Sequence, residues 1–410
     1  MRITRNALHL SLALLAAVSL SACDFGEQPY ETEEGENLSI RGPAERTLSG
    51  FDSDTTGTYN IFPFTIEKDY SWSIEEDGAT IVDRRRENEY IEVEFSEPGT
   101  YTLNIDDGEH TGALPIEVEY RDPEIQAESL GFDALASALV AAGLSDGDPN
   151  SDPSSSDTLA TGGPFTLLAP TDEAFVAAFD TSGNDAVEGG ELPGMEVLAD
   201  ILSYHVVTDS LGTSDITEGQ EEGTLAGSEL TFHTNGTITV EDGTDLTTDD
   251  AAFTDITNRA TSGGLLHGLD DLLLPPNASV SFNDQTSTDS VTVNVRSVYV
   301  PEDGYVAIHD STLLDDPPQV AGSVIGVSEY LEAGVYNGLE ITLFDVPGKD
   351  FDDDMVLEGD QLLIAMPHEE TSMNEEYNFL TSGGAEDGAY TEGGDPVVAP
   401  AAVAVGGGEQ

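Results

Sequence analysis

The chain has 410 residues, of which 81 are acidic and only 12 are lysine or arginine, so its formal net charge is −69 at pH 7. It offers no basic patch to neutralise phosphates, which excludes nucleic acid as a partner. The chain also has a single cysteine, which excludes an internal disulfide and leaves the domains to be stabilised by their cores alone.

The acidic residues are scattered along the whole chain, with no run longer than Asp352–Asp354. On a globular surface of this size they lie roughly 14 Å apart on average. The Debye length is about 10 Å at 0.1 M salt and about 3 Å at 1 M. Such a surface repels itself in dilute buffer and is tolerated in brine, so we expect a halophilic source. A surface that collects Ca²⁺ is the alternative interpretation of the same charge.

Residues 1–22 have the pattern of a secretory signal. Arg2 and Arg5 precede an apolar run from about Leu8 to Leu20, and small residues lead into Cys23. The run is too short to span a membrane comfortably. It resembles a bacterial lipoprotein signal, which implies that Cys23 is lipidated and becomes the first residue of the mature chain. The membrane is then a partner through acyl chains, two or more of which give stable anchoring.

Residues 23–39 are rich in Glu and Gly, and we expect a flexible acidic linker there. From residue 40 to 121, apolar and polar residues alternate in five short runs separated by turn sequences. This pattern predicts a β-sandwich with Trp72 in its core. Tyr70-Ser71-Trp72 followed by Pro98-Gly99-Thr100-Tyr101 resembles immunoglobulin-like modules of bacterial surface proteins, the polycystic-kidney-disease type in particular.

From residue 122 to 277 the periodicity becomes mixed. Phe132, Leu135, Leu139 and Val140 fall on one face of a predicted helix that ends near Gly143. Phe165–Pro170 has the composition of a buried strand. Thr171 suits the N-cap of the next helix, and Asp172 suits the positive end of its dipole.

A second amphipathic helix is predicted over residues 197–202, and it leads into Tyr204-His205. Alternating strands are expected around residues 230–232 and 237–240. The segment closes with residues 263–275, an apolar run that contains His267.

Three motifs in this region resemble those of fasciclin domains. Residues 165–175 resemble the first signature, Tyr204-His205 the central pair, and residues 264–275 the closing signature. Gly268 departs from the family, which usually has a branched apolar residue after the histidine, and we expect it to weaken that strand. The resemblance implies an α/β wedge with an adhesive role at a cell or matrix surface. It also implies that the motif residues are structural or binding residues; these are Thr171, Asp172, Tyr204, His205 and His267.

Residues 281–405 return to strand patterns and predict a second β-sandwich. Residues 307–310, 322–328 and 365–368 resemble an uncharacterised surface domain of salt-loving prokaryotes, for which the resemblance implies no activity. The predicted fold class is therefore multidomain, with an N-terminal immunoglobulin-like β-sandwich, a central α/β fasciclin-like domain and a C-terminal β-sandwich.

No catalytic constellation is visible in the sequence. It contains no Gly-x-Ser-x-Gly elbow, no phosphate-binding glycine loop and no His-Glu-x-x-His zinc helix. Lipid on Cys23 removes the only thiol. We therefore predict a non-enzymatic protein without catalytic residues. An acid–base pair of Tyr204 and His205 is the alternative to the internal hydrogen bond that a fasciclin-like fold favours for His205.

We predict no bound metal or other cofactor, with two alternatives left open. One is a Ca²⁺ loop with oxygen ligands at alternate positions, although it lacks the glycine expected at position six; its ligands are Asp146, Asp148, Asn150, Asp152 and Asp157. The other is a zinc or copper site in which His309 with Asp310 and His368 with Glu369 meet across a sheet.

These features predict a lipid-anchored adhesion or recognition protein of a halophilic bacterium. It is expected in the cell envelope, at the outer membrane or cell surface. The expected partner is an envelope polysaccharide, another surface protein or a second copy of the chain. The alternative is a periplasmic or envelope lipoprotein with an assembly, metal-binding or solute-binding task.

Overall fold

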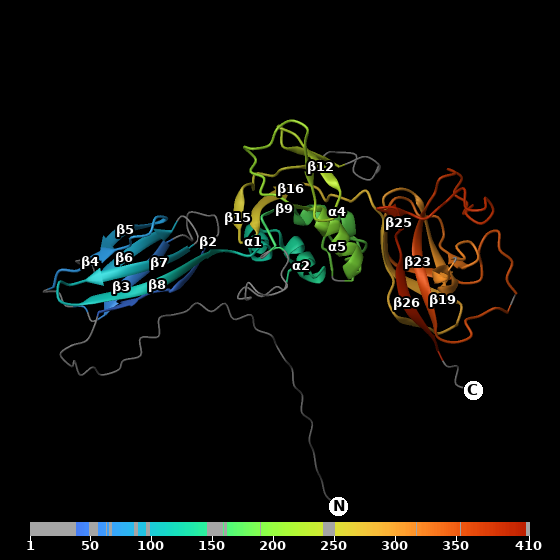
Figure 1. Ribbon diagram of the computed structural model, residues 1–410, viewed down its shortest axis with the longest axis horizontal. Coiled ribbons are helices and arrows are strands. Elements are labelled where there is room, and N and C mark those ends of the chain that lie inside the picture. Colours follow the sequence, from blue (N-terminus) through green and yellow to red (C-terminus); the bar gives the residue numbers. More distant parts are fainter. Residues whose placement is uncertain are drawn as a thin grey trace, which may run out of the picture.

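The computed structural model describes residues 38–48, 56–62, 64, 68–85, 89–95, 99–145, 159, 162–188, 190–240, 251–316, 318–352 and 354–406. Three bodies lie in a row, with a β-sandwich at each end and a mixed α/β body between them (Figure 1). The predicted signal, Cys23, most of the linker and the predicted Ca²⁺ loop lie outside the described residues. Within the described ranges, no helix combines the length and apolar character that a membrane span needs.

The N-terminal body is a sandwich of two four-stranded sheets, in the orders β1-β3-β6-β5 and β2-β8-β7-β4. Its strands follow the period-two pattern; in β3, Tyr59 and Ile61 point into the core and their neighbours point outward. Trp72 is buried in the same core. The strands are β1 (Ser39–Arg41), β2 (Glu45–Leu48), β3 (Thr56–Phe62), β4 (Ser71–Ser73), β5 (Ala79–Arg85), β6 (Tyr90–Phe95), β7 (Gly99–Asp106) and β8 (Thr111–Tyr120).

The central body packs helices against a four-stranded sheet, β10-β9-β16-β15, and carries a second sheet, β11-β12-β13-β14 (Figure 1). Strands β9 and β16 pair in parallel although they are distant in sequence. The helices are α1 (Pro123–Leu130), α2 (Asp133–Ala141), α4 (Asp172–Phe179) and α5 (Met195–Tyr204). The strands are β9 (Phe165–Pro170), β10 (Val206–Val207), β11 (Gln220–Gly223), β12 (Glu229–Phe232), β13 (Thr237–Val240), β14 (Ala251–Ala252), β15 (Arg259–Thr261) and β16 (Gly264–Leu269).

The first predicted helix corresponds to α2, which ends near Gly143 as expected, but it differs from the prediction at one position and is preceded by a helix that was not predicted. Two helices, α1 and α2, occupy this part of the chain, and Gly131 ends the first with a left-handed φ of 88°. Leu135 and Leu139 are buried as predicted, but Val140 is 44% exposed. The predicted face was wrong at Val140 because Ala138, not Val140, completes the buried side of α2.

Gly268 sits where no side chain fits. A Cβ atom there would lie 2.3 Å from Thr254 Oγ1 and 2.7 Å from the Phe132 ring. Glycine at this position, where the fasciclin pattern usually has a branched residue, is therefore explained by Phe132, which fills the space that a branched side chain would need.

We expect Gly268→Val to destabilise the protein by about 2–3 kcal/mol, because overpacking a well-packed core forces neighbours out of place. Gly190→Ala is the matched control, since nothing lies within 4 Å of a Cβ atom at that position. The control should change stability by less than about 0.5 kcal/mol. Denaturant titration at high salt measures both variants. Equal stabilities for Gly268→Val and wild type would contradict this expectation and would mean that the Phe132 side chain can move aside without cost.

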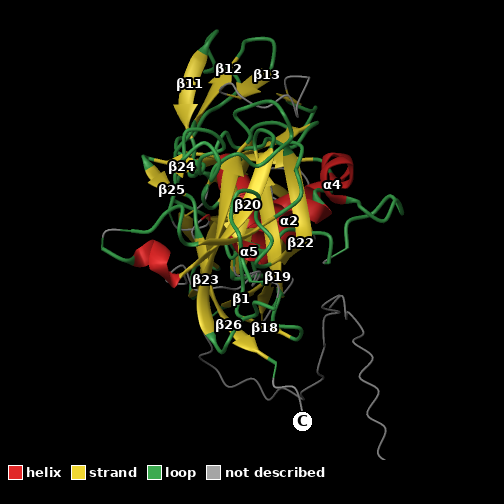
Figure 2. Ribbon diagram, turned by 90° about the vertical axis from the view of Figure 1, so that its right-hand side faces the viewer, coloured by secondary structure: helices red, strands yellow, loops and turns green. Residues whose placement is uncertain are grey.

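The C-terminal body is a second sandwich, with sheets β17-β19-β22 and β18-β26-β23-β20-β21 (Figure 2). Together with the N-terminal and central bodies, it confirms the predicted fold class. Its elements are β17 (Ser279–Ser281), β18 (Gln285–Ser287), β19 (Thr292–Val300), β20 (Gly304–Asp310), η1 (Ser311–Leu314), β21 (Val324–Val327), β22 (Gly334–Thr342), β23 (Gln361–Glu369), β24 (Thr391–Glu392), β25 (Asp395–Pro396) and β26 (Ala399–Val405).

Strands β20 and β23 are covered on both faces. One face packs in the sandwich core, which includes Val306, Ile308 and Leu363. The opposite face packs in a second cluster, where Tyr305 and Ala307 meet Tyr377 and Phe379 from the loop after β23. As a result, polar side chains on that second face are removed from solvent.

Candidate functional site

The first fasciclin motif acts through helix ends. Thr171 is the N-cap of α4, and its hydroxyl accepts a hydrogen bond from Ala174 N at 3.2 Å. Asp172 lies in the first turn of α4. Its carboxylate accepts from Ala134 N at 2.9 Å, in the first turn of α2. Asp172 therefore joins two helix starts, which is a structural task that helix dipoles favour.

His205 joins α5 to the end of the domain. Its Nδ1 lies 2.8 Å from the carbonyl oxygen of Ile201, and its Nε2 accepts from Leu273 N at 2.9 Å. The carbonyl can only accept, so Nδ1 carries the proton. The side chain is fully buried, and burial lowers the pKa of His205 to about 4. Tyr204, beside it, is also buried and donates to Glu229 O at 3.3 Å.

His267 plays a similar part in β16. Its Nε2 lies 2.8 Å from the carbonyl oxygen of Leu211, and Asn258 N donates to its Nδ1 at 3.2 Å. Burial lowers the pKa of His267. In both histidines the backbone occupies each ring nitrogen. This leaves no nitrogen for substrate, so the alternative acid–base role of Tyr204 and His205 has no free site on the imidazole.

The central and C-terminal bodies share an interface. Tyr299 of β19 is part of the central body's hydrophobic cluster, and its hydroxyl donates to Pro275 O at 2.7 Å. Gly194 N donates to Ser297 Oγ at 2.8 Å, and Asn337 Nδ2 donates to Glu191 O at 2.7 Å. The last two contacts join residues more than a hundred positions apart, and no local sequence pattern predicts them.

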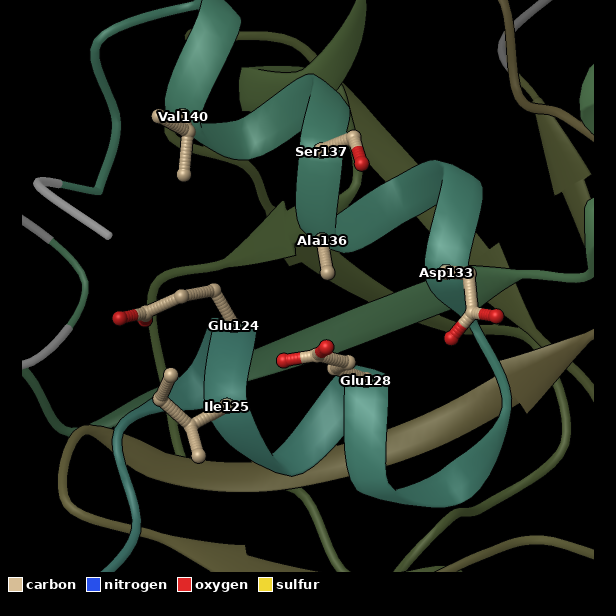
Figure 3. A pocket seen from close by; sticks show the side chains of 7 residues that line it. All are labelled: Glu124, Ile125, Glu128, Asp133, Ala136, Ser137 and Val140. Carbon is tan, nitrogen blue, oxygen red and sulfur yellow. The ribbon is translucent and has the colours of Figure 1, made fainter. Parts of the chain in front are cut away.

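A hollow of about 420 Å³ opens between α1 and α2 (Figure 3). Three carboxylates line it, those of Glu124, Glu128 and Asp133, together with Ser137 and apolar side chains. No histidine or lysine lines it, so the Ser137 hydroxyl has no general base other than a carboxylate there. An acidic hollow on a strongly acidic chain provides no evidence for a ligand.

The two C-terminal histidines meet, but their neighbouring carboxylates do not join them. His309 and His368 are fully buried, with ring centroids 5.9 Å apart. Successive strand residues face opposite sides, so Asp310 and Glu369 point away; Asp310 caps η1 by accepting from Thr312 N at 2.9 Å. The sequence-based interpretation of paired histidines and carboxylates was therefore wrong for the carboxylates. Across the described residues, no group of three or more His, Cys, Asp or Glu is placed to hold a metal ion.

Several partners of these histidines escaped sequence reasoning. Ser323 and Asp387 anchor His309 and His368, and Asn258 and Leu211 anchor His267. Most of these contacts use backbone atoms, and a backbone atom leaves no signature in residue type.

Comparisons with known proteins fit this architecture. A model of the fasciclin domain matches residues 151–275, and a model of a domain of unknown function (DUF7282) matches residues 278–404. The chain is similar to Cell surface glycoprotein 2 of Haloarcula hispanica, with 39% identity over 128 residues, 31% of this chain and only 12% of that protein. It is also similar to Protein sll1483 of Synechocystis sp., with 33% identity over 155 residues, 37% of this chain and 72% of that protein.

Among solved structures, the immunoglobulin domains 1–5 of Sidekick-1 align with 91% of this chain and 60% of that chain at 11% identity. The TM-score is 0.19, too low to indicate a shared arrangement of domains.

Fold and site together define a multidomain, β-rich protein built around an α/β module whose motif histidines serve the fold. The chain belongs to the fasciclin-domain family. Its C-terminal body is a domain of unknown function that follows the fasciclin domain directly.

Proposed function

We propose that this protein is a cell-surface adhesion or recognition protein, held at the membrane by lipid on Cys23 and acting without catalysis. The observation that carries the proposal is the fasciclin domain, together with similarity to a halophile's cell surface glycoprotein. Both ring nitrogens of His205 and of His267 already have hydrogen-bond partners in the backbone, which favours a binding module over an active site.

The three bodies lie in a row (Figure 1), an arrangement that suits contact with a partner at a distance from the membrane. The N-terminal sandwich lies at one end of the row and the C-terminal sandwich at the other (Figure 1). The shared Tyr299 packing joins the central and C-terminal bodies. In brine, screened charges steer binding weakly, and contact must come from apolar and hydrogen-bonded groups. An envelope polysaccharide, a surface protein and a second copy of the chain are the partners that fit.

A gene deletion with complementation tests the proposal. Cells without the protein should aggregate or form biofilm less than wild-type cells, and the wild-type gene should restore this behaviour. A gene that encodes the Cys23→Ser variant should not restore aggregation, because the mature chain would lack its lipid and would leave the cell surface. Mass spectrometry of the mature amino terminus reports the lipid directly.

Normal clumping of the deletion strain would contradict the adhesive role. Full restoration by Cys23→Ser, with no fatty acid on the wild-type terminus, would contradict the anchor alone. An envelope lipoprotein that handles a metal is the second candidate function. The observation that favours it is the buried pair of histidines in the C-terminal body.

A further inference from the structure

The C-terminal histidines differ from the other buried histidines in one respect. In His205 and His267 both ring nitrogens are hydrogen-bonded. In His309 and His368 the Nε2 atoms are buried and have no hydrogen-bond partner among the described residues. Buried polar atoms without partners are rare and indicate a missing ligand, ion or water.

The protonation of both rings follows from their anchors. His368 Nδ1 lies 2.6 Å from the carbonyl oxygen of Asp387, which can only accept, so Nδ1 carries the proton. His309 Nδ1 lies 2.8 Å from Ser323 Oγ, and that hydroxyl donates its own proton to Val320 O. His309 therefore donates from Nδ1 as well. Each Nε2 is left with a lone pair, and a histidine that ligates a metal is held in this way, with its other nitrogen donating to the protein.

The sheet register brings the rings together. Ala307 on β20 pairs with Met366 on β23, His309 pairs with Ile364, and His368 pairs with Tyr305. His309 and His368 thus flank the Ala307–Met366 pair on one face of the sheet. The residues of this middle pair are the small Ala307 and Met366, both buried, so a thioether side chain lies in the same row as the two histidines.

The spacing of the rings suits one ion. A metal bound by two imidazole nitrogens at about 2 Å each needs those nitrogens about 4 Å apart. The ring centroids lie 5.9 Å apart and the ring planes are inclined by 25°, so a shared ion requires the two Nε2 edges to turn toward each other. The surroundings exclude bulk water, since Phe379 packs edge-on against His368 at 4.9 Å and Tyr377 lies 5.6 Å from it.

The ligand chemistry selects the ion. Ca²⁺ and Mg²⁺ require several oxygen ligands, and Zn²⁺ is almost always bound by at least three protein ligands. Two neutral imidazoles offset little of the desolvation cost of a buried divalent cation. A monovalent, soft cation that accepts imidazole and thioether fits these groups. We propose that His309 and His368 bind one Cu(I) ion through their Nε2 atoms, with Met366 as an additional thioether ligand.

The site is independent of the adhesive function, so its test uses binding alone. The mature chain carrying Cys23→Ser, which removes the only thiol, is loaded anaerobically with Cu(I) in molar sodium sulfate, which avoids chloride complexes. Bicinchoninate competes for the ion. The chain should retain one equivalent of copper, and X-ray absorption at the copper edge should show imidazole scattering. Zn(II), offered in the same way, should not be retained.

The variants His309→Phe and His368→Phe keep ring volume and aromatic packing, and each should lose at least nine tenths of the bound copper. His233→Phe is the matched control, because both ring nitrogens of His233 are already bonded, to Glu218 and Thr239; it should keep the full equivalent. Met366→Leu should weaken retention several-fold.

Three results would overturn the proposal: a mature chain that retains no copper, copper retained by both phenylalanine variants, or an absorption spectrum without imidazole. If a phenylalanine variant fails to fold, retention and spectrum of the parent chain decide the matter. A parent chain without copper would also mean that water satisfies the two Nε2 atoms.

Discussion

Raising NaCl from about 0.1 M to 2 M is expected to raise the melting temperature of the mature chain steeply. Unit charges roughly 14 Å apart in water repel by about 0.3 kcal/mol before screening, and the surface holds many such pairs. Their sum is comparable with the whole stability of a domain, roughly 5–15 kcal/mol. Screening removes most of it at molar salt, where the Debye length is about 3 Å.

The two lysines offset little of this repulsion. Lys68 pairs with Asp107 at 2.7 Å and with Glu109 at 3.2 Å. Lys349, the other lysine, instead donates to the carbonyl oxygens of Gly322 and Val324. Calorimetry across the salt series, with sucrose of equal osmolality as the control, measures the effect. A flat melting temperature, or an equal rise in sucrose, would contradict the halophilic interpretation.

His205→Ala is expected to destabilise the fasciclin domain by about 4 kcal/mol. The substitution leaves Ile201 O and Leu273 N unsatisfied in the core and opens a cavity beside them. His233→Ala, at a side chain that is 26% exposed, should cost less than about 1 kcal/mol. Urea unfolding at 2 M NaCl compares the two. Similar losses of unfolding free energy in both variants would mean that the two hydrogen bonds of His205 do not stabilise the domain.

The same variant has a predicted pH dependence. Burial lowers the folded-state pKa of His205 to about 4, whereas the unfolded value is near 6.5. Below about pH 6.5 the unfolded chain binds a proton that the folded chain does not, so the stability present above that pH is lost as pH falls toward about 4. The cost from this side chain reaches about 3 kcal/mol. The stability difference between wild type and His205→Ala should therefore shrink from pH 7 to pH 4.5. A difference independent of pH would contradict a neutral, buried His205.

The strands and motif positions were accessible from the sequence because each depends on local pattern. The period-two runs around Tyr59 and Trp72 became the N-terminal sandwich, and Thr171 became the N-cap of α4. Periodicity failed at Val140, where a hydrophobic residue lies exposed on α2. Periodicity shows which positions are apolar but does not show which of these side chains pack in the core.

The sites depended on long-range packing, which local pattern does not encode. His309 and His368 were candidates from their residue types, but their anchors Ser323 and Asp387 come from other segments. From the sequence, Gly268 was expected to weaken its strand. The structure shows that the Phe132 ring occupies the space beside it. The Tyr299 contact with Pro275 likewise follows only from the packing of one domain on the next.

Protease treatment of intact cells tests the central claim most directly. A protein that grips partners outside the cell must be cut by an added protease while the membrane is whole. We predict that peptides from the fasciclin and C-terminal domains are released from intact cells at high salt, while a cytoplasmic marker stays uncut. Complete protection of these domains until the cells are broken would contradict a surface adhesion protein.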